Sequence, residues 1–331
     1  MTTLVTGATG FTGINIVRAL AGAGEIVVAV GHRPASAECH QFLRGLEGRV
    51  RLLTGDVLDS SAMLRLSEQH GVRRIVHAAA VTPSGGLEMS YPRRLIDVNL
   101  VGTVNMLEVA REVSASRFVF VSSSGVYGAP EDRSQVVPED SPLQLNGLYP
   151  ICKYSCELLL KRYGQLFGLS TVTGRMTSIY GPMERATPSR GRPSIVYRVV
   201  KALLAGRAIM ARGQELVRDY THIEDAGLIW KHLTLAENLD HELYNVSSGV
   251  AYSLGEVLET LQELDPAFSY SYAGPGDDPD VELTPEAERG ALDISRVVTE
   301  FDFAPKYNLK LGLQGYLEWS RDYPGLFSTE Q

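Results

Sequence analysis

A stretch of eight residues near the start of the chain, TGATGFTG from Thr6 to Gly13, constrains the fold more than any other feature. Apolar residues precede it at 4–5, as in a buried strand, and recur after it at 14, 16, 17 and 20, as on a helix packed against a sheet. Strand, glycine turn and helix in this order are typical of phosphate binding. Gly7 would allow a sharp turn, Gly10 a close approach of the backbone to a pyrophosphate, and Gly13 close packing of helix on sheet. A simple helix cap is the alternative, because the spacing is Gly-x-x-Gly-x-x-Gly. The cofactor candidates here are Gly7, Thr9, Gly10, Phe11, Thr12 and Gly13.

Length and charge bound the class of protein. The 331 residues suffice for one large domain or two modest ones, and the net charge of −8 argues against a general nucleic-acid binder. The three cysteines form no CxxC pair and the seven histidines show no ligand spacing, so we expect reduced thiols and no metal site. No charged leader precedes the first strand, and no apolar run reaches the roughly 20 residues of a membrane span. These features predict a cytoplasmic protein with no membrane partner.

Strand and helix patterns alternate through the first half of the chain. Apolar runs predict strands at residues 4–5, 25–30, 50–53, 74–77, 117–121 and 170–175. Helices are predicted at 95–113 and over about five turns from Tyr149. Such alternation implies right-handed βαβ units and a parallel sheet with helices on both faces. Beyond residue 176 the alternation breaks. A helix is predicted there at 195–205, and another follows Ser253, whose spacing to Glu256 is that of a capping box.

The ends of the predicted strands carry further cofactor candidates. The second strand ends near His32 and Arg33, without the acidic residue that would bind the ribose hydroxyls of NAD. Because an arginine at this place accommodates a 2′-phosphate, the pair favours NADP over NAD as cofactor. The fourth strand runs into small side chains that would let a ligand lie against the backbone, although tight helix packing would select the same residues: Ala78, Ala79 and Ala80.

Tyr149 and Lys153 are one helical turn apart and face the same way. A free tyrosine has a pKa of about 10 and is a poor base at neutral pH. A nearby lysine cation together with an oxidised nicotinamide would favour the phenolate. Ser123 or Ser124, at the end of the fifth strand, would hydrogen-bond a substrate hydroxyl. The alternative is an ordinary surface tyrosine and lysine. The ordered combination with the glycine motif favours an enzyme that transfers a proton and a hydride.

The ordered series TGATGFTG, HAAA, VSSSGVYG, YPICK, GRMTSIYGP, RDYTHIED and YNVSSG resembles the extended short-chain dehydrogenase/reductase family, and within it the nucleotide-sugar epimerase/dehydratase group. The resemblance covers essentially the whole chain. It implies an α/β fold in which a doubly wound parallel Rossmann sheet with a seventh strand carries a smaller carboxyl-terminal α/β substrate domain. We expect the NAD(P)-binding domain to comprise residues 1–176 and about 218–247, and the substrate domain to comprise 177–217 and 248–331.

The resemblance also implies roles for individual residues. The catalytic set is Ser123, Tyr149 and Lys153, with Ser124 as second choice for the serine. The cofactor site adds contacts of Asp56 and Val57 with the adenine, of Lys153 with the nicotinamide ribose, and of Tyr149 and Asn99. A homodimer is expected through the two helices that follow Leu95 and Tyr149.

The chain departs from the pattern of this group at several positions. Members that are 4,6-dehydratases carry an Asp-Glu pair where this chain has Ser124 and Gly125, so dehydration is not expected. Ser178 replaces an asparagine that contacts the nucleotide diphosphate, and a later phosphate-binding arginine is missing. A loop of three arginines suits a diphosphate or the carboxylate of a sugar acid, or is simply a solvated basic loop. The substrate candidates are Thr82, Ser124, Thr177, Ser178, Arg185, Arg190, Arg192 and Arg218.

Three functions remain open at this point. The first is an NAD(P)-dependent oxidoreductase or epimerase acting on a sugar hydroxyl, with a nucleotide sugar as the default substrate of the group. The second is a dehydrogenase of a free sugar acid or related polyhydroxy acid, which the Ser178 substitution and the arginine loop favour. The third is a non-catalytic NADP-sensing protein, against which the intact Ser-Tyr-Lys set speaks.

Overall fold

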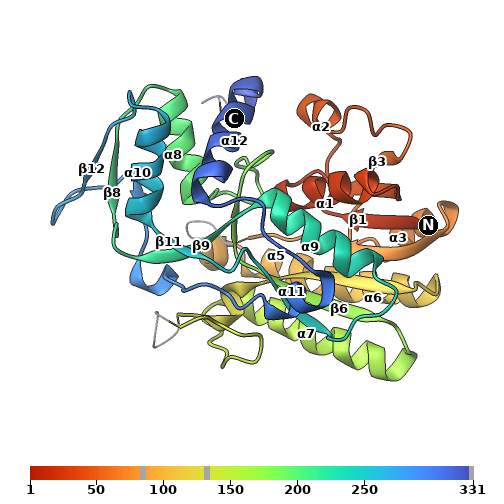
Figure 1. Cartoon of the computed structure of the whole chain (residues 1–331). Coiled ribbons are helices and arrows are strands. Elements are labelled where there is room, and N and C mark those ends of the chain that lie inside the picture. Colours follow the sequence, from red (N-terminus) through yellow and green to blue (C-terminus); the bar gives the residue numbers. More distant parts are fainter. Residues whose placement is uncertain (83–86, 130–134, 328–331) are drawn as a thin grey trace.

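The computed structural model describes residues 1–82, 87–129 and 135–327. Its centre is a seven-stranded parallel sheet in the order β10-β6-β5-β4-β1-β2-β3 (Figure 1). All six strands expected from the apolar runs are present, with ends that differ by at most two residues, and a seventh joins beside β6. The strands are β1 (Thr2–Thr6), β2 (Ile26–Gly31), β3 (Val50–Thr54), β4 (Val72–His77), β5 (Arg117–Ser123), β6 (Thr171–Met176) and β10 (Leu243–Val246).

Helices cover both faces of this sheet because its strands are apolar on both sides. On one face α1 (Phe11–Gly22) packs against α9 (Ile223–Leu235), and on the other face α6 (Gly102–Glu112) packs against α3 (Ser60–Gln69) and α7 (Leu148–Phe167). Each face has its own buried core. The Rossmann-type doubly wound sheet predicted from the sequence is therefore confirmed.

The second half of the chain adds two smaller sheets. One has the order β11-β9-β7, with strands Ala251–Ser253, Val217–His222 and Ser178–Tyr180; the other has the order β12-β8-β13, with strands Tyr270–Tyr272, Ile209–Arg212 and Val281–Glu282. Helices α8 (Ile195–Leu204), α10 (Leu254–Leu264), α11 (Ser295–Phe301) and α12 (Leu309–Asp322) complete this part. The expected helix at 195–205 is confirmed, and so is the capping box of Ser253 and Glu256. The division of the chain into two domains at the stated residues stays a prediction.

The long helix expected at 95–113 is wrong in its middle. The chain forms α5 (Pro92–Ile96), then a π-helical segment η1 (Asp97–Val101), and then α6. The widened turn has a physical cause in Asn99, whose side chain bonds the backbone of Val81 while its carbonyl oxygen accepts a bond from the Thr103 hydroxyl at 2.8 Å. Periodicity cannot distinguish a π turn from an α turn.

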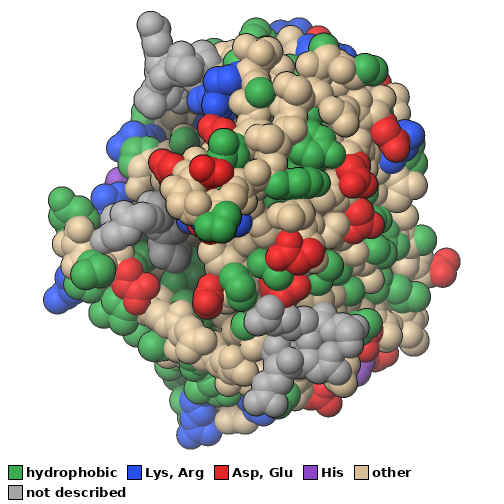
Figure 2. All heavy atoms as spheres, turned by 90° about the vertical axis from the view of Figure 1, so that its left-hand side faces the viewer, with side chains coloured by type: hydrophobic (Ala, Val, Ile, Leu, Met, Phe, Trp, Pro, Cys, Tyr) green, Lys and Arg blue, Asp and Glu red, His purple; other side chains and the backbone are tan. Residues whose placement is uncertain are grey.

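Short elements fill the connections. They are α2 (Ala37–Phe42), α4 (Leu87–Ser90) and the 3-10 turns η2 (Ser124–Tyr127), η3 (Pro285–Ala287) and η4 (Pro324–Leu326). Within the described residues, no helix is long and apolar enough to span a bilayer. On the face turned to the viewer in Figure 2, acidic, basic and hydrophobic side chains are interspersed.

Candidate active site

The glycine-rich stretch forms a tight turn between β1 and α1. Gly7 has a φ of +65°, in the left-handed region, and a Cβ there would lie 2.8 Å from the Ala78 carbonyl oxygen. A Cβ at Gly13 would lie 2.2 Å from the Gly7 carbonyl oxygen, so α1 rests directly on the turn. A Cβ at Gly10 would meet only that same oxygen, at 3.1 Å, because Gly10 borders a cavity. This cradle fits the pyrophosphate of a dinucleotide, bound by the free N–H groups at the start of α1.

A cavity of about 1070 Å³ lies at the carboxyl ends of the sheet strands. This is the edge at which open α/β sheets bind ligands. Nearly all the residues predicted for the cofactor, the substrate and catalysis line it: Gly7, Thr9, Gly10, Phe11, Thr12, Gly13, His32, Arg33, Asp56, Val57, Ala78, Ala79, Ala80, Thr82, Ser123, Tyr149, Lys153, Thr177, Ser178, Arg185, Arg190, Arg192 and Arg218.

Two predicted site residues, Asn99 and Ser124, do not line the cavity, and their assigned roles stay predictions. Asn99 is 1% exposed, and its amide accepts from the Val81 N–H at 3.0 Å and donates to the Val81 carbonyl at 2.8 Å. These two bonds attach Asn99 to the segment that follows Ala80. Ser124 is 3% exposed, and its hydroxyl oxygen lies 3.4 Å from Arg289 Nη1.

The end of β2, where the sequence predicts the adenosine ribose, borders the cavity. His32 Nδ1 lies 3.5 Å from Asp56 Oδ2, and Asp56 also accepts from the Leu58 N–H at 2.9 Å. Arg33 lines the cavity beside them and makes no ion pair with any described residue. Its positive charge is therefore available to a ligand.

The three predicted catalytic residues meet at the inner end of the cavity. Ser123 ends β5, and Tyr149 and Lys153 lie in the first turns of α7. Lys153 is 2% exposed, its Nζ donates to the Val121 carbonyl at 2.8 Å, and the same nitrogen lies 5.6 Å from the centroid of the Tyr149 ring. The i, i+4 spacing on one helix accounts for the Tyr–Lys proximity, and the bond from Lys153 to Val121 attaches α7 to β5, the strand that Ser123 ends.

Burial dominates the protonation of this group. Burial raises the pKa of Tyr149 to about 12, although the Arg190 cation and a hydrogen bond from Ser123 lower it. Burial lowers the pKa of Lys153 to about 8. At neutral pH the phenol of the cofactor-free protein is therefore protonated and the ammonium is charged. From the sequence, Lys153 and an oxidised nicotinamide were the expected positive charges near Tyr149; in the structure the Arg190 cation also lowers the pKa of Tyr149.

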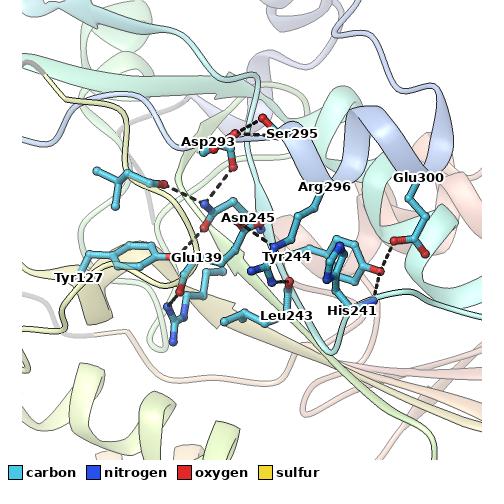
Figure 3. Close-up of polar contacts among 12 residues, drawn as sticks. Tyr127, Glu139, His241, Leu243, Tyr244, Asn245, Asp293, Ser295, Arg296 and Glu300 are labelled. Atoms are coloured by element: carbon cyan, nitrogen blue, oxygen red, sulfur yellow. Dashed lines mark hydrogen bonds and ion pairs between the residues drawn. The ribbon is translucent and has the colours of Figure 1, made fainter.

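A polar network fixes the elements next to Ser123, the predicted catalytic serine. Arg175 on β6 pairs with Glu157 on α7 at 2.7 Å, and the Ser122 hydroxyl donates to Glu157 at 2.5 Å. Figure 3 shows the adjoining part of the network, in which Tyr127 donates to Asn245 Oδ1 at 2.7 Å. The Asn245 amide in turn donates to the carbonyls of residues 137 and 293, each at 3.0 Å. These bonds hold the η2 turn, which follows Ser123, against β10.

Several arginines line the cavity as well. Arg218 Nε donates to the Ser178 hydroxyl. Arg198 Nε and Tyr220 Oη are buried and have no hydrogen-bond partner among the described residues, and both side chains line the cavity. Sequence reasoning missed these two residues. Tyr220 carried a usable signal, because it follows Arg218 by two positions on β9 and so shares its face. Arg198 on α8 carried none.

The arginine loop is attached to the cavity wall. Arg190 donates to the fully buried Glu184 at 2.8 Å, and its guanidinium carbon lies 5.3 Å from the centroid of the Phe11 ring. The loop is tied down where the Thr82 N–H donates to the Ser189 carbonyl at 2.9 Å. Arg185 donates to the Thr9 carbonyl of the glycine turn at 2.8 Å. Within the described part of the chain, no group of His, Cys, Asp and Glu could hold a metal ion.

Comparison with known proteins agrees with this site. The model of the NAD dependent epimerase/dehydratase family matches residues 3–247. A probable UDP-glucuronate 4-epimerase of Rhizobium meliloti (strain 1021) is 31% identical over 234 residues, which span 67% of this chain and 64% of that protein. A dTDP-glucose 4,6-dehydratase of Streptomyces griseus is 30% identical, over 96% of this chain and 93% of that protein.

A solved structure extends the likeness to three dimensions. The UDP-glucose 4-epimerase of Thermus thermophilus, in complex with NAD, is 25% identical and has a TM-score of 0.80, over 97% of this chain and 99% of that chain. The likeness covers both the large sheet and the smaller sheets. Glycine turn, cavity and family model agree, and the chain belongs to the NAD-dependent epimerase/dehydratase family.

Proposed function

We propose that the protein is an NAD(P)-dependent oxidoreductase or epimerase that acts on a hydroxyl group of a nucleotide sugar. One observation carries the proposal. Ser123, Tyr149 and Lys153 line the same cavity as Arg198 and Arg218. A substrate that carries both a reactive hydroxyl and a diphosphate matches this set of groups.

Tyr149 is the proposed base. Its phenol must lose its proton before it can accept one from a substrate hydroxyl, and a pKa of about 12 makes this unfavourable without further positive charge. Lys153 and Arg190 supply positive charge on the protein side. When bound, the oxidised cofactor supplies a further positive charge and the capacity to accept and return a hydride. We expect the cofactor to be held by the glycine turn and by Lys153.

Ser123 and Lys153 would orient the reacting groups. The Ser123 hydroxyl accepts from the Gly125 N–H at 3.0 Å, which leaves its own proton free for Tyr149 or for a substrate oxygen. One N–H of the Lys153 ammonium donates to the Val121 carbonyl, and its two other N–H groups remain available to a ligand in the cavity. These bonds restrict both side chains before a ligand arrives, which favours preorganised catalysis.

The diphosphate would bind at the arginines that line the cavity. Arg198 Nε and Tyr220 Oη are donors without a described partner, and Arg218 and Arg192 line the same wall. Buried donors of this kind are costly unless they are satisfied, and a phosphate oxygen accepts several hydrogen bonds. Arg198 would thereby compensate for the asparagine that Ser178 replaces.

We propose epimerisation or dehydrogenation rather than 4,6-dehydration. Ser124 and Gly125 occupy the positions of the acidic pair of the dehydratases, and Ser124 faces the Arg289 guanidinium at 3.4 Å. A leaving hydroxyl would find no carboxylic acid there to protonate it. Since one relative is a dehydratase, the assay below includes products that have lost water.

For the cofactor we propose a preference for NADP over NAD. The His32 ring lies within ion-pair distance of the Asp56 carboxylate, at 3.5 Å, whereas Arg33 borders the cavity without an ion-pair partner among the described residues. A 2′-phosphate would pair with that guanidinium. The related Thermus structure contains NAD, so both cofactors must be compared directly.

We also propose a homodimer through the exposed face of α7. Ile151, Leu158 and Leu166 are between 43% and 54% exposed and follow one another at intervals of seven and eight residues, so they share one side of the helix. A row of apolar side chains left to solvent is typical of a subunit interface. Light scattering would give the mass of the particle.

The deciding experiment incubates the purified protein with UDP-sugars and free sugar acids, each with NAD and with NADP. Accumulation of reduced cofactor identifies a dehydrogenase, an inverted sugar without net reduction identifies an epimerase, and a product that has lost water would identify a dehydratase and refute the exclusion of dehydration. Tyr149→Phe removes the proposed base and should abolish turnover while cofactor binding persists. Undiminished turnover by this variant would refute the assignment of the base, and the absence of turnover by the wild-type protein on every substrate would refute the proposed enzyme.

A further inference from the structure

Residues 185–193, which carry the three arginines of the arginine loop, form a loop whose ends are joined by one buried carboxylate. Glu184 is fully buried, and its carboxylate accepts from the Ser194 N–H at 2.7 Å and from the Ser194 hydroxyl at 2.8 Å. Ser194 also caps α8, because its hydroxyl accepts from the Tyr197 N–H at 3.1 Å. A compact surface loop with joined ends is an Ω-loop, a type that frequently carries function.

The ends of the 185–193 loop are fixed, whereas the loop itself is not packed into the core. Just before it, the Pro182 carbonyl accepts from the side-chain amide of Asn15 on α1 at 3.0 Å. None of residues 185–193 is buried, and the exposed ones are 186, 188, 191 and 192. A segment without buried side chains opens at a lower free energy than the core does, so this loop can move while its ends stay in place.

The 185–193 loop is attached to two neighbouring segments of the cofactor cradle. Arg185 donates to the Thr9 carbonyl of the glycine turn at 2.8 Å. The Ser189 carbonyl accepts from the Thr82 N–H at 2.9 Å and from the Thr82 hydroxyl at 3.2 Å. Thr82 follows β4, and β4 lies beside β1 in the sheet. The loop therefore reaches both the glycine turn and the end of the neighbouring strand, and its residues line the same cavity.

Arg190 brings a positive charge of the loop to the start of α1. Its guanidinium carbon lies 5.3 Å from the ring centroid of Phe11, the first residue of that helix, and one of its N–H groups donates to Glu184 at 2.8 Å. A guanidinium has five N–H donors and pairs well with phosphate oxygens. A pyrophosphate that lies against the glycine turn would therefore be favoured by Arg190 as well.

We propose that the 185–193 loop is a lid that closes over the bound cofactor and must open for the cofactor to enter or leave. The inference rests on the proposed function, which puts the cofactor at the glycine turn, and it adds how cofactor exchange is controlled. Glu184 and Ser194 hold the base of the lid. The bonds from Thr82 to Ser189 and from Arg185 to Thr9 break when it opens.

A reversible cross-link between the lid and the segment after β4 tests the proposal. Because a backbone hydrogen bond joins Thr82 to Ser189, cysteines at both positions should lie within the span of a disulfide, and the three native cysteines are buried. The double variant Thr82→Cys and Ser189→Cys is oxidised either before or after loading with NADPH or NADH, and thiol titration confirms the cross-link. The fluorescence of the reduced nicotinamide then follows cofactor entry, and a chase with oxidised cofactor follows release.

A lid predicts that both rates respond. Oxidation after loading should slow release, and oxidation before loading should slow entry, each at least about 10-fold, because the opening step is blocked. Reduction of the disulfide should restore both rates. A residue that only contacts the cofactor would leave the rate of entry unchanged.

A second variant opens the lid instead of locking it. Arg185→Met removes the bond to Thr9 and should raise the rates of entry and release about 10-fold, since a hydrogen bond from a charged donor no longer favours the closed loop. Arg207→Met is the matched control, because it removes an exposed arginine that pairs with Asp280, and it should change neither rate. If the disulfide does not form, Arg185→Met decides.

Each outcome supports or overturns the lid. Equal rates of the oxidised and reduced double variant would overturn it and leave the proposed function standing. Faster release without faster entry in Arg185→Met would mark a direct contact and overturn it too. Oxidation that slows the binding of UDP-glucose but not of NADPH would assign the loop to the nucleotide sugar and overturn the cofactor lid. If neither NADPH nor NADH binds to the wild-type protein, the proposed function fails and the lid fails with it.

Discussion

Two neighbouring glycines of the turn offer a test that separates folding from cofactor binding. In Gly13→Ala the new Cβ would lie 2.2 Å from the Gly7 carbonyl oxygen, so backbone must move against backbone. In Gly10→Ala the new Cβ meets that oxygen at 3.1 Å and otherwise projects toward the cavity. Gly22→Ala, at the end of the same helix, meets nothing within 4 Å and serves as the control.

The magnitudes follow from these contacts. Alanine in place of glycine within a helix gains about 0.5–1 kcal/mol, which Gly22→Ala should realise in part. At Gly13 the clash opposes this gain with a cost of about 3 kcal/mol, the upper end for overpacking, so a net loss of about 2 kcal/mol is expected. At Gly10 the loss should stay below about 1 kcal/mol, since only a few tenths of an ångström must be relieved.

Thermal unfolding with and without cofactor measures both effects. At a cofactor concentration about 100 times Kd, binding stabilises the wild-type protein by about 2.7 kcal/mol. A 100-fold weaker Kd in Gly10→Ala would reduce this to about 0.4 kcal/mol at the same concentration. With about 2 °C per kcal/mol for a chain of this size, the wild-type shift is about 5 °C and that of Gly10→Ala about 1 °C.

The refuting result is equally specific. A Gly10→Ala protein whose cofactor-induced shift equals that of the wild-type protein would show that no pyrophosphate lies against Gly10. A Gly13→Ala protein as stable as Gly22→Ala would show that α1 does not rest on the turn. Either result would remove the physical argument for the glycine spacing.

Three further predictions follow from particular contacts. Glu157→Gln should lower the free energy of unfolding by about 3–5 kcal/mol, because it leaves the charge of the buried Arg175 unpaired. Urea unfolding measures this change, and a loss below about 1 kcal/mol would contradict the prediction. Arg33→Ala should raise KM for NADP about 10-fold and leave KM for NAD unchanged in steady-state assays, whereas an equal effect on both cofactors would count against a 2′-phosphate site. Burial lowers the pKa of His77 to about 3 and that of His222 to about 4. Both folded values lie below the unfolded value of 6.5, so the unfolded state binds more protons as the pH falls, and stability present above pH 6.5 is lost below it. At pH 4.5 the two histidines together should lower the free energy of unfolding by about 5 kcal/mol relative to pH 7.5. Urea unfolding curves extrapolated to water measure this free energy. A value that stays constant from pH 7.5 to 4.5 would refute the prediction.

Much of the fold and of the candidate site follows from patterns that extend over only a few residues of the sequence. The TGATGFTG turn, the apolar runs of the strands and the Tyr149–Lys153 spacing are local, because strand alternation and the helical turn repeat within a few residues. Once parallel strands are inferred, their carboxyl ends must share one edge, and most candidate residues therefore reach one cavity. Fold class and the position of the site could thus be predicted from the sequence.

What remained undetermined depends on contacts between distant residues. No local pattern indicates that the Asn99 side chain would hydrogen-bond the backbone of Val81 and that its helix would widen into a π turn. Nor does one indicate that Arg198 and Tyr220 would line the same cavity. Arg289 is 165 residues away from Ser124 in sequence, and only the packing of the second half of the chain brings them together. Local spacing fixes which way a side chain points within its own element, whereas its burial and its partners depend on long-range packing, which here decides where the unpaired charges of the site lie.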